Sequence, residues 1–181
     1  MADLSALTPG TWNVDAAHSR VGFTVRHLMV SKVRGSFTTF SGAVTVGEDK
    51  LASSVVAEVQ MASIATGDDN RDNHLRTGDF FDVAAHPTMT FRSTGITADG
   101  GDYVLAGELT IKGITKPVTF ELEFEGVSPD PWGGTRAGFS AETEISRKEW
   151  GLEYNAVLET GGVVISDKVK LELDIQVVKV G

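Results

Sequence analysis

The fold class is decided by residues 118–125, which read VTFELEFE. Apolar residues alternate strictly with Thr and Glu, so an extended chain here has one apolar face and one polar face. On a helix, the same apolar residues would be scattered around the axis. The stretch therefore predicts a half-buried antiparallel β-strand.

The same two-residue period recurs along the chain. Residues 169–177 repeat it most clearly, with Val and Leu on one face and charged residues on the other. Weaker runs begin near Trp12, Val21, Phe40, Val55, Met89, Tyr103 and Ala137. Turn-forming stretches separate the runs, and no helical pattern alternates with them. We expect an all-β protein of about eight antiparallel strands, with residues 1–181 as one domain.

Eight such strands must close into a barrel or stack as a sandwich, and closure removes the exposed edges that invite aggregation. Small residues on the predicted inner faces leave room inside; they are Gly42, Ala57, Gly107, Ala137 and Ala141. This favours an eight-stranded barrel with a cavity for one small ligand. The alternative is that larger neighbours fill that space.

Composition excludes several classes of function. The chain has 181 residues, 41% of them hydrophobic, and no Cys, which excludes disulfides and thiolate chemistry. A formal charge of −9 argues against nucleic acid and against a polybasic membrane contact. The N-terminus lacks the pattern of a secretory signal, and no apolar run is long enough to span a bilayer. We therefore expect a cytoplasmic protein without stable membrane insertion.

One segment, residues 68–87, departs from the strand pattern: DDNRDNHLRTGDFFDVAAHP. Asp68 or Asp69 can cap a short helix, and Gly78 suits its C-terminal end. Its large apolar residues are Leu75, Phe80 and Phe81. We expect a short helix covering one end of the barrel, and the alternative is an ordinary solvated connection.

The same segment partly resembles a Ca²⁺-binding loop. Residues 68–73 read D-x-N-x-D-N, with Asp79 in the twelfth position. The Gly of the sharp turn and the bidentate Glu are missing, so a calcium-stabilised module is a minor alternative. The four histidines lack the close spacing of a zinc pair, and no metal site is expected.

Two polar residues are predicted to continue apolar inner faces. His27 continues the face of Val21, Phe23 and Val25, and Arg147 continues that of Ile145. Because a charge inside an apolar barrel is costly, each must be paired or lie near the rim. Each could hold the polar head of a ligand, or could emerge where its strand ends. An enzyme using His27 or His74 as acid or base is the alternative from another class.

Several segments, in order along nearly the whole chain, resemble the YceI family. They are residues 12–19 (WNVDAAHS), 21–27 (VGFTVRH), 33–37 (VRGSF), 40–42 (FSG), 72–82 (DNHLRTGDFFD), 86–91 (HPTMTF), 107–118 (GELTIKGITKPV) and 147–151 (RKEWG). The resemblance implies a lipocalin-like antiparallel barrel with an apolar tunnel. It also implies a long-chain ligand such as a quinone tail or prenyl pyrophosphate, a homodimer, and no established catalytic residues.

On this interpretation the protein is a non-enzymatic carrier of a polyisoprenoid or similar fatty amphiphile. No cofactor is expected apart from a possible bound polyisoprenoid or quinone. The residues expected to contact the apolar chain are Phe23, Phe40, Phe80, Phe81, Phe91, Leu105, Leu109, Phe120, Phe139 and Ile145. Those expected near the polar head are Arg147, His27, His74 and Arg76.

Overall fold

The computed structural model describes residues 3–28, 30–155 and 165–181. Its strands are β1 (Gly10–Val14), β2 (Arg20–His27), β3 (Ser31–Phe37), β4 (Phe40–Val46), β5 (Ser54–Gln60), β6 (Ile64–Ala65), β7 (Thr88–Asp99), β8 (Asp102–Ile111), β9 (Ile114–Pro129), β10 (Thr135–Ser146) and β11 (Ile165–Lys179). Its helices are α1 (Asp69–Leu75) and the 3₁₀ turns Leu4–Ala6, Ala16–His18, Lys50–Ala52, Met61–Ser63 and Arg147–Trp150.

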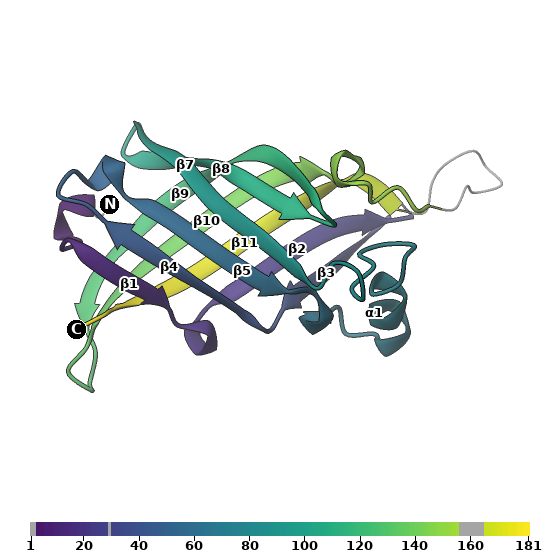
Figure 1. Ribbon diagram of the computed structural model, residues 1–181, viewed down its shortest axis with the longest axis horizontal. Helices are drawn as coiled ribbons and strands as arrows, with labels where there is room; N and C mark the ends of the chain where they lie inside the picture. The colour runs from purple at the N-terminus through teal and green to yellow at the C-terminus, as the bar shows by residue number, and fades with distance from the viewer. Residues whose placement is uncertain (1–2, 29, 156–164) are drawn as a thin grey trace.

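Eight of these strands close into an antiparallel barrel. They follow the order β1-β4-β5-β7-β8-β9-β10-β11, and β11 pairs back with β1. Helix α1 lies at one end, and the chain termini lie at the other (Figure 1). The predicted all-β, eight-stranded, lipocalin-like barrel with a short helix at one end is confirmed.

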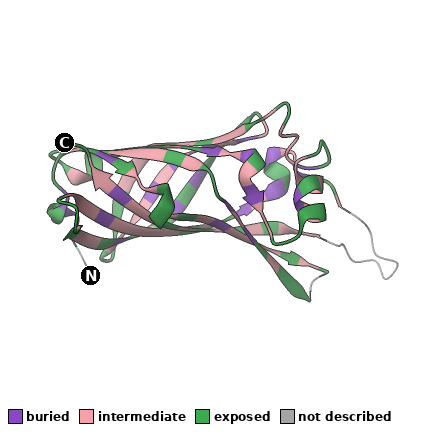
Figure 2. Cartoon of the chain, turned by 90° about the horizontal axis from the view of Figure 1, so that it is seen from below, coloured by how far each residue is buried: buried purple, intermediate pink, exposed green. Residues whose placement is uncertain are grey.

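Strand β9 shows why the sequence period produces this wall. Val118, Phe120 and Phe124 are buried, while Thr119 and the three Glu residues between and after them are exposed. Buried and exposed residues likewise alternate along other strands (Figure 2). Burial of the apolar face stabilises the sheet, since each buried side chain of this size contributes about 1.5–3 kcal/mol.

At the helix end, strands β2, β3 and β6 extend the wall beyond the closed barrel. Strands β1 and β2 lie one after the other along β11, because the 3₁₀ turn Ala16–His18 interrupts them. Strand β3 pairs with β2, and on its other edge β6 pairs with Ser36 and Phe37 only. In the described part of the chain, residues 31–35 have no strand on that edge. The β2–β3 hairpin therefore projects beside the α1 end.

The opposite end is filled by the N-terminal segment. Leu4 and Leu7 are buried against Trp12, whose indole N–H donates to the carbonyl of Thr8. Phe124 and Val177 belong to the same cluster. The barrel is therefore packed with apolar side chains at the end that carries the termini.

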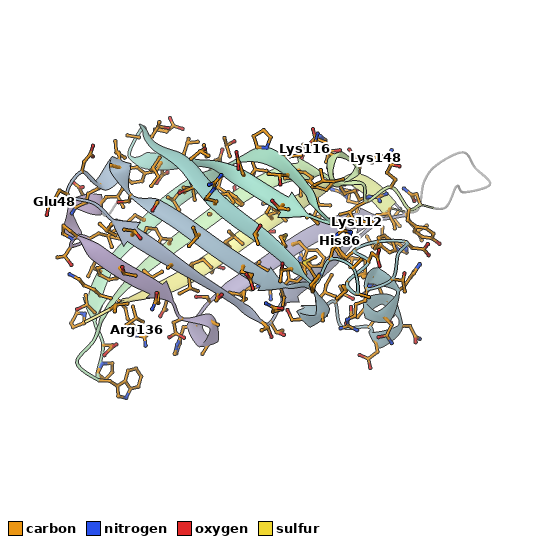
Figure 3. All side chains as sticks on the ribbon, in the orientation of Figure 1. Glu48, His86, Lys112, Lys116, Arg136 and Lys148 are labelled. Atoms are coloured by element: carbon orange, nitrogen blue, oxygen red, sulfur yellow. The ribbon has the colours of Figure 1, made fainter. Side chains whose placement is uncertain are left out.

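An ion-pair cluster joins three segments at this packed end. Arg136 of β10 donates to Asp15, which follows β1, at 2.6 Å and to Asp130 of the β9–β10 turn at 3.1 Å. Figure 3 labels Arg136 toward the end of the barrel that is opposite α1. The hydrogen bond from Arg136, with another from His18, lowers the pKa of Asp15 to about 2. The Arg136–Asp15 ion pair therefore stabilises the folded state at neutral pH, where both groups are charged.

Candidate ligand-binding site

The barrel encloses an apolar cavity of about 190 Å³. All eight barrel strands contribute side chains to its wall. Six residues predicted to contact an apolar ligand line it: Phe40, Phe91, Leu105, Leu109, Phe120 and Phe139. Val55, Leu171 and Leu173 line it as well, and the same inward parity identifies them in the sequence. The interior is therefore not filled by its own side chains.

The small size of Gly107 was expected to leave empty space in the barrel, but the Phe91 ring fills that space. A Cβ at Gly107 would lie 2.3 Å from the Phe91 ring and 2.7 Å from the carbonyl oxygen of Arg92. Phe91 in turn meets Phe120 edge to face, with ring centroids 5.6 Å apart. Gly107 thus accommodates an aromatic ring from the neighbouring strand, and the cavity is formed between larger side chains.

A second cavity, of about 490 Å³, lies at the α1 end. We call it the mouth cavity. Six predicted site residues line it: Phe23, His27, His74, Phe80, Phe81 and Arg147. Leu152 and Tyr154, from the segment after β10, also line it and were missed, because no strand or helix period marks that segment.

Three aromatic rings stand between the two cavities. Phe37 lines the interior cavity, whereas Phe23 and Phe81 line the mouth cavity. The Phe37 ring centroid lies 5.6 Å from that of Phe23 and 6.4 Å from that of Phe81. We call these residues the aromatic partition. A chain long enough to occupy both cavities must pass these rings.

Helix α1 is held at the mouth by its own polar residues. Asp68 caps it by accepting from the amide of Arg71, and buried Asp72 accepts from the amide and hydroxyl of Thr66. Arg76 donates to the carbonyls of Ala62 and Ile64. Arg76 therefore fastens the helix to the β6 segment and lines neither cavity.

A cluster of three rings forms one wall of the mouth. His74, Phe80 and Tyr154 lie with ring centroids 5.0–5.1 Å apart, all edge to face. The His74 ring is also hydrogen-bonded to Asp79 at 2.8 Å. Among the described residues, no Ser, Thr or Lys side chain hydrogen-bonds to the ring of His74 or of His27. No nucleophile activated by either histidine is visible in that part of the chain.

Arg147 is buried at the mouth, with 4% of its surface exposed. Its guanidinium donates to the carbonyls of Ser166 and Tyr154 at 2.9 Å, and also to those of Leu152 and Ile165. Burial lowers the pKa of Arg147, and the charge of Asp167 partly offsets this effect. Arg147 therefore adds positive charge to the mouth wall and also organises the backbone there. Ile145, which precedes it, is buried in the core but lines neither cavity.

The carboxylates of the segment that partly resembles a calcium-binding loop each have a different hydrogen-bond partner. Asp68 caps α1, Asp72 binds Thr66, and Asp79 binds His74. Among the described residues, no three His, Asp or Glu side chains are grouped as a metal ion requires. No helix in the same residues is both long and apolar enough to cross a bilayer.

The geometry places the protein in the class of closed antiparallel barrels with an apolar interior and a polar, partly charged mouth. Residues 12–177 match the model of the YceI-like domain. The chain is 41% identical to a UPF0312 protein of Staphylococcus aureus (strain bovine RF122 / ET3-1), over 87% of this chain and 91% of that protein. A UPF0312 protein of Staphylococcus epidermidis (strain RP62A) is 39% identical over 89% and 93%. The chain belongs to the YceI family, as its sequence motifs indicate.

Solved structures agree on the fold. BcnA of Burkholderia cenocepacia superposes with a TM-score of 0.76 at 25% identity, covering 90% of this chain and 98% of that one. The YCEI protein of Campylobacter jejuni gives 0.73 at 28% identity, over 92% and 96%. A polyisoprenoid binding domain from Saccharophagus degradans gives 0.72 over 93% and 98%, but at 17% identity it shows the fold alone. These solved structures therefore share the barrel fold of this chain.

Proposed function

We propose that this protein is a non-enzymatic carrier or reservoir for a polyisoprenoid or a comparable long-chain amphiphile. The observation that carries the proposal is the pair of cavities, one within the barrel and one at its mouth. The interior cavity alone is smaller than the roughly 300–1,000 Å³ of most small-molecule sites, but the two together reach that range. The tail would occupy the interior and the head group the mouth.

The size of the ligand follows from the energy of burial. Burying hydrocarbon contributes about 0.8 kcal/mol per CH₂, or roughly 4 kcal/mol per isoprene unit at best. Immobilising a ligand costs about 4–15 kcal/mol, and ordering a flexible chain costs more. One isoprene unit is therefore too short, and several units are needed for useful affinity.

The chemistry of the mouth favours an anionic head group. Arg26, Arg71 and Arg147 line the mouth cavity. Arg71 is oriented by Thr66, to which it donates twice. A diphosphate would meet positive charge there, although it must compete with solvent. In this proposal, residues 68–81 act as a lid, because Leu75, Phe80 and Phe81 turn their apolar side chains toward the mouth cavity.

Fluorescence titration tests the proposal. Trp12 and Trp150 are buried, whereas Trp132 is 77% exposed, so Trp132→Phe removes the fluorescence of the exposed tryptophan and leaves that of the two buried ones. We expect that variant to respond to a prenyl diphosphate of several isoprene units. It should not respond to a one-unit diphosphate, which serves as a control for the head group. Equal responses to both ligands, or none to either, would contradict a chain-binding site.

Three further parts of the proposal need separate measurements. Mass spectrometry of a prenyl diphosphate or quinone after incubation with the protein should show unchanged ligand; an altered product would favour an enzyme using His27 or His74.

Native mass spectrometry of freshly purified protein tests the homodimer and identifies a co-purifying lipid. Cell fractionation tests the cytoplasmic location expected from the sequence.

A further inference from the structure

The β2–β3 hairpin carries positive charge in an otherwise acidic protein. Residues 16–47 contain no Asp or Glu but include Arg20, Arg26, Lys32 and Arg34. This segment has a formal charge of +4, which leaves −13 for the rest of the chain. The net charge of −9 therefore conceals a local basic region at this end of the molecule.

Strand register places three of these cations on one face of the hairpin. Arg26 lies directly across from Lys32, and Arg34 lies two residues further along β3. All three are exposed. The opposite face carries Val25, His27 and Val33, which line the mouth cavity. One side of the hairpin is thus a wall of the mouth, and the other is a basic surface, with Arg26 at the boundary because it also lines the mouth cavity.

The two described residues at the tip of the hairpin are apolar and exposed. Leu28 and Val30 are 40% and 84% exposed, and neither lines a cavity. Leu28 also has a φ of 55°, a left-handed conformation in which Asn or Gly is favoured over a branched apolar residue. Folding of the hairpin does not explain a leucine there. A residue that breaks a local rule without a structural gain points to a function.

We propose that the β2–β3 hairpin docks the mouth of the barrel on an anionic lipid surface. Leu28 and Val30 enter the interface between head groups and acyl chains, while Arg26, Lys32 and Arg34 contact the acidic head groups. Apolar side chains flanked by cations bind such surfaces reversibly, and each cation strengthens binding about fivefold. Docking brings the mouth to the bilayer, where a lipid can be exchanged. The inference does not depend on the proposed cargo.

Flotation with vesicles tests the docking surface. We expect the full chain to float with phosphatidylcholine vesicles containing about a quarter phosphatidylglycerol, and not with phosphatidylcholine alone. Added salt should weaken the binding, because it screens the contact. Leu28→Asn combined with Val30→Ser should reduce binding at least tenfold. Lys32→Gln combined with Arg34→Gln should reduce it about 25-fold.

Matched controls separate docking from folding and from charge. Val180→Ser removes a 52% exposed valine at the terminus-bearing end, and Arg92→Gln removes an exposed cation from β7; both should bind vesicles as the wild type does. Leu28→Asn should keep the melting temperature, since Asn adopts its backbone conformation readily. Absence of wild-type binding to anionic vesicles, or full binding by the tip variant, would overturn the proposal.

The test also separates docking from lipid carriage. None of Leu28, Val30, Lys32 and Arg34 lines either cavity, so these variants should still bind a prenyl diphosphate in solution. Loss of vesicle binding with intact prenyl binding leaves the carrier proposal standing. If the protein instead binds vesicles but no prenyl chain, the carrier proposal fails and the docking proposal stands.

Discussion

Arg147 has two roles that a binding experiment must separate. Its side chain is buried, and its donors are satisfied by four backbone carbonyls from the segments on either side of residues 156–164. Parity along β10 placed Arg147 on the inner face, with emergence at the strand end as the alternative, and the structure has the side chain buried. Parity could not predict the partners, because carbonyl groups carry no sequence signal and their positions depend on how the chain turns after the strand.

Replacing Arg147 by Met should lower the free energy of unfolding by about 3 kcal/mol. The cause is the loss of donors to carbonyls that remain buried. Arg147→Lys keeps the charge with fewer donors and should recover only part of that stability. Urea unfolding measures both changes. Unchanged stability in the Met variant would show that these hydrogen bonds contribute nothing.

The same pair of variants tests the head group. Arg147→Lys should retain binding of a prenyl diphosphate, while Arg147→Met should weaken the diphosphate far more than a quinone with the same tail. The physical reason is that only the diphosphate depends on positive charge at the mouth. Equal losses of affinity for both ligands would show that Arg147 maintains the structure of the mouth and does not bind the head group.

At the scale of elements, the aromatic partition lies between the two cavities. It is built from β2, β3 and the segment that follows α1, so its three rings come together only in the folded chain. The sequence predicted Phe23 and Phe81 as ligand contacts and omitted Phe37. Parity tells which side of a wall a residue faces. How far along the barrel it lies depends on strand register, which parity does not give.

Phe37→Ala should join the two cavities and speed the association of a long prenyl chain, because no ring then has to move. It should also cost about 3–5 kcal/mol of stability. Phe124→Ala is the matched control: Phe124 is 1% exposed and lines neither cavity, so its loss should cost similar stability without faster association. Stopped-flow fluorescence measures the rates. Identical rates for all three proteins would show that the partition is no barrier.

At the scale of the whole molecule, the period-two pattern was sufficient to predict the class of fold and the apolar wall of the barrel. It was not sufficient to predict which residues form the mouth. Tyr154 joins His74 and Phe80 from a segment without periodicity, and Arg76 turned out to fasten α1 to β6. Both depend on where two distant segments meet in space, and neither position follows from local spacing.

The ion-pair cluster at the packed end makes global stability depend on acid. Because the pKa of Asp15 falls from 3.8 to about 2 on folding, its contribution is full above pH 3.8 and is lost as the pH falls toward 2. We expect Asp15→Asn to lower stability at pH 7 by at most about 2 kcal/mol, with partial solvent exposure reducing this figure. The wild type and the variant should converge near pH 2.

Urea unfolding across that pH range checks the prediction. Glu48→Gln is the control, since it removes the same charge from an exposed residue for which the described structure shows no ion pair. A Glu48 variant that loses as much stability at pH 7 would show that net charge, and not the Arg136 contact, explains the effect.

Leu4, Leu7 and Trp12 fill the terminus-bearing end, and this imposes an order on any cargo. If the proposed ligand enters at the α1 end, its tail must enter first and its head group must leave first, because the described residues at the other end are packed together. An acceptor could then recognise the head while the tail is still sheltered. Molecules with bulky groups at both extremities would be rejected, whatever their length.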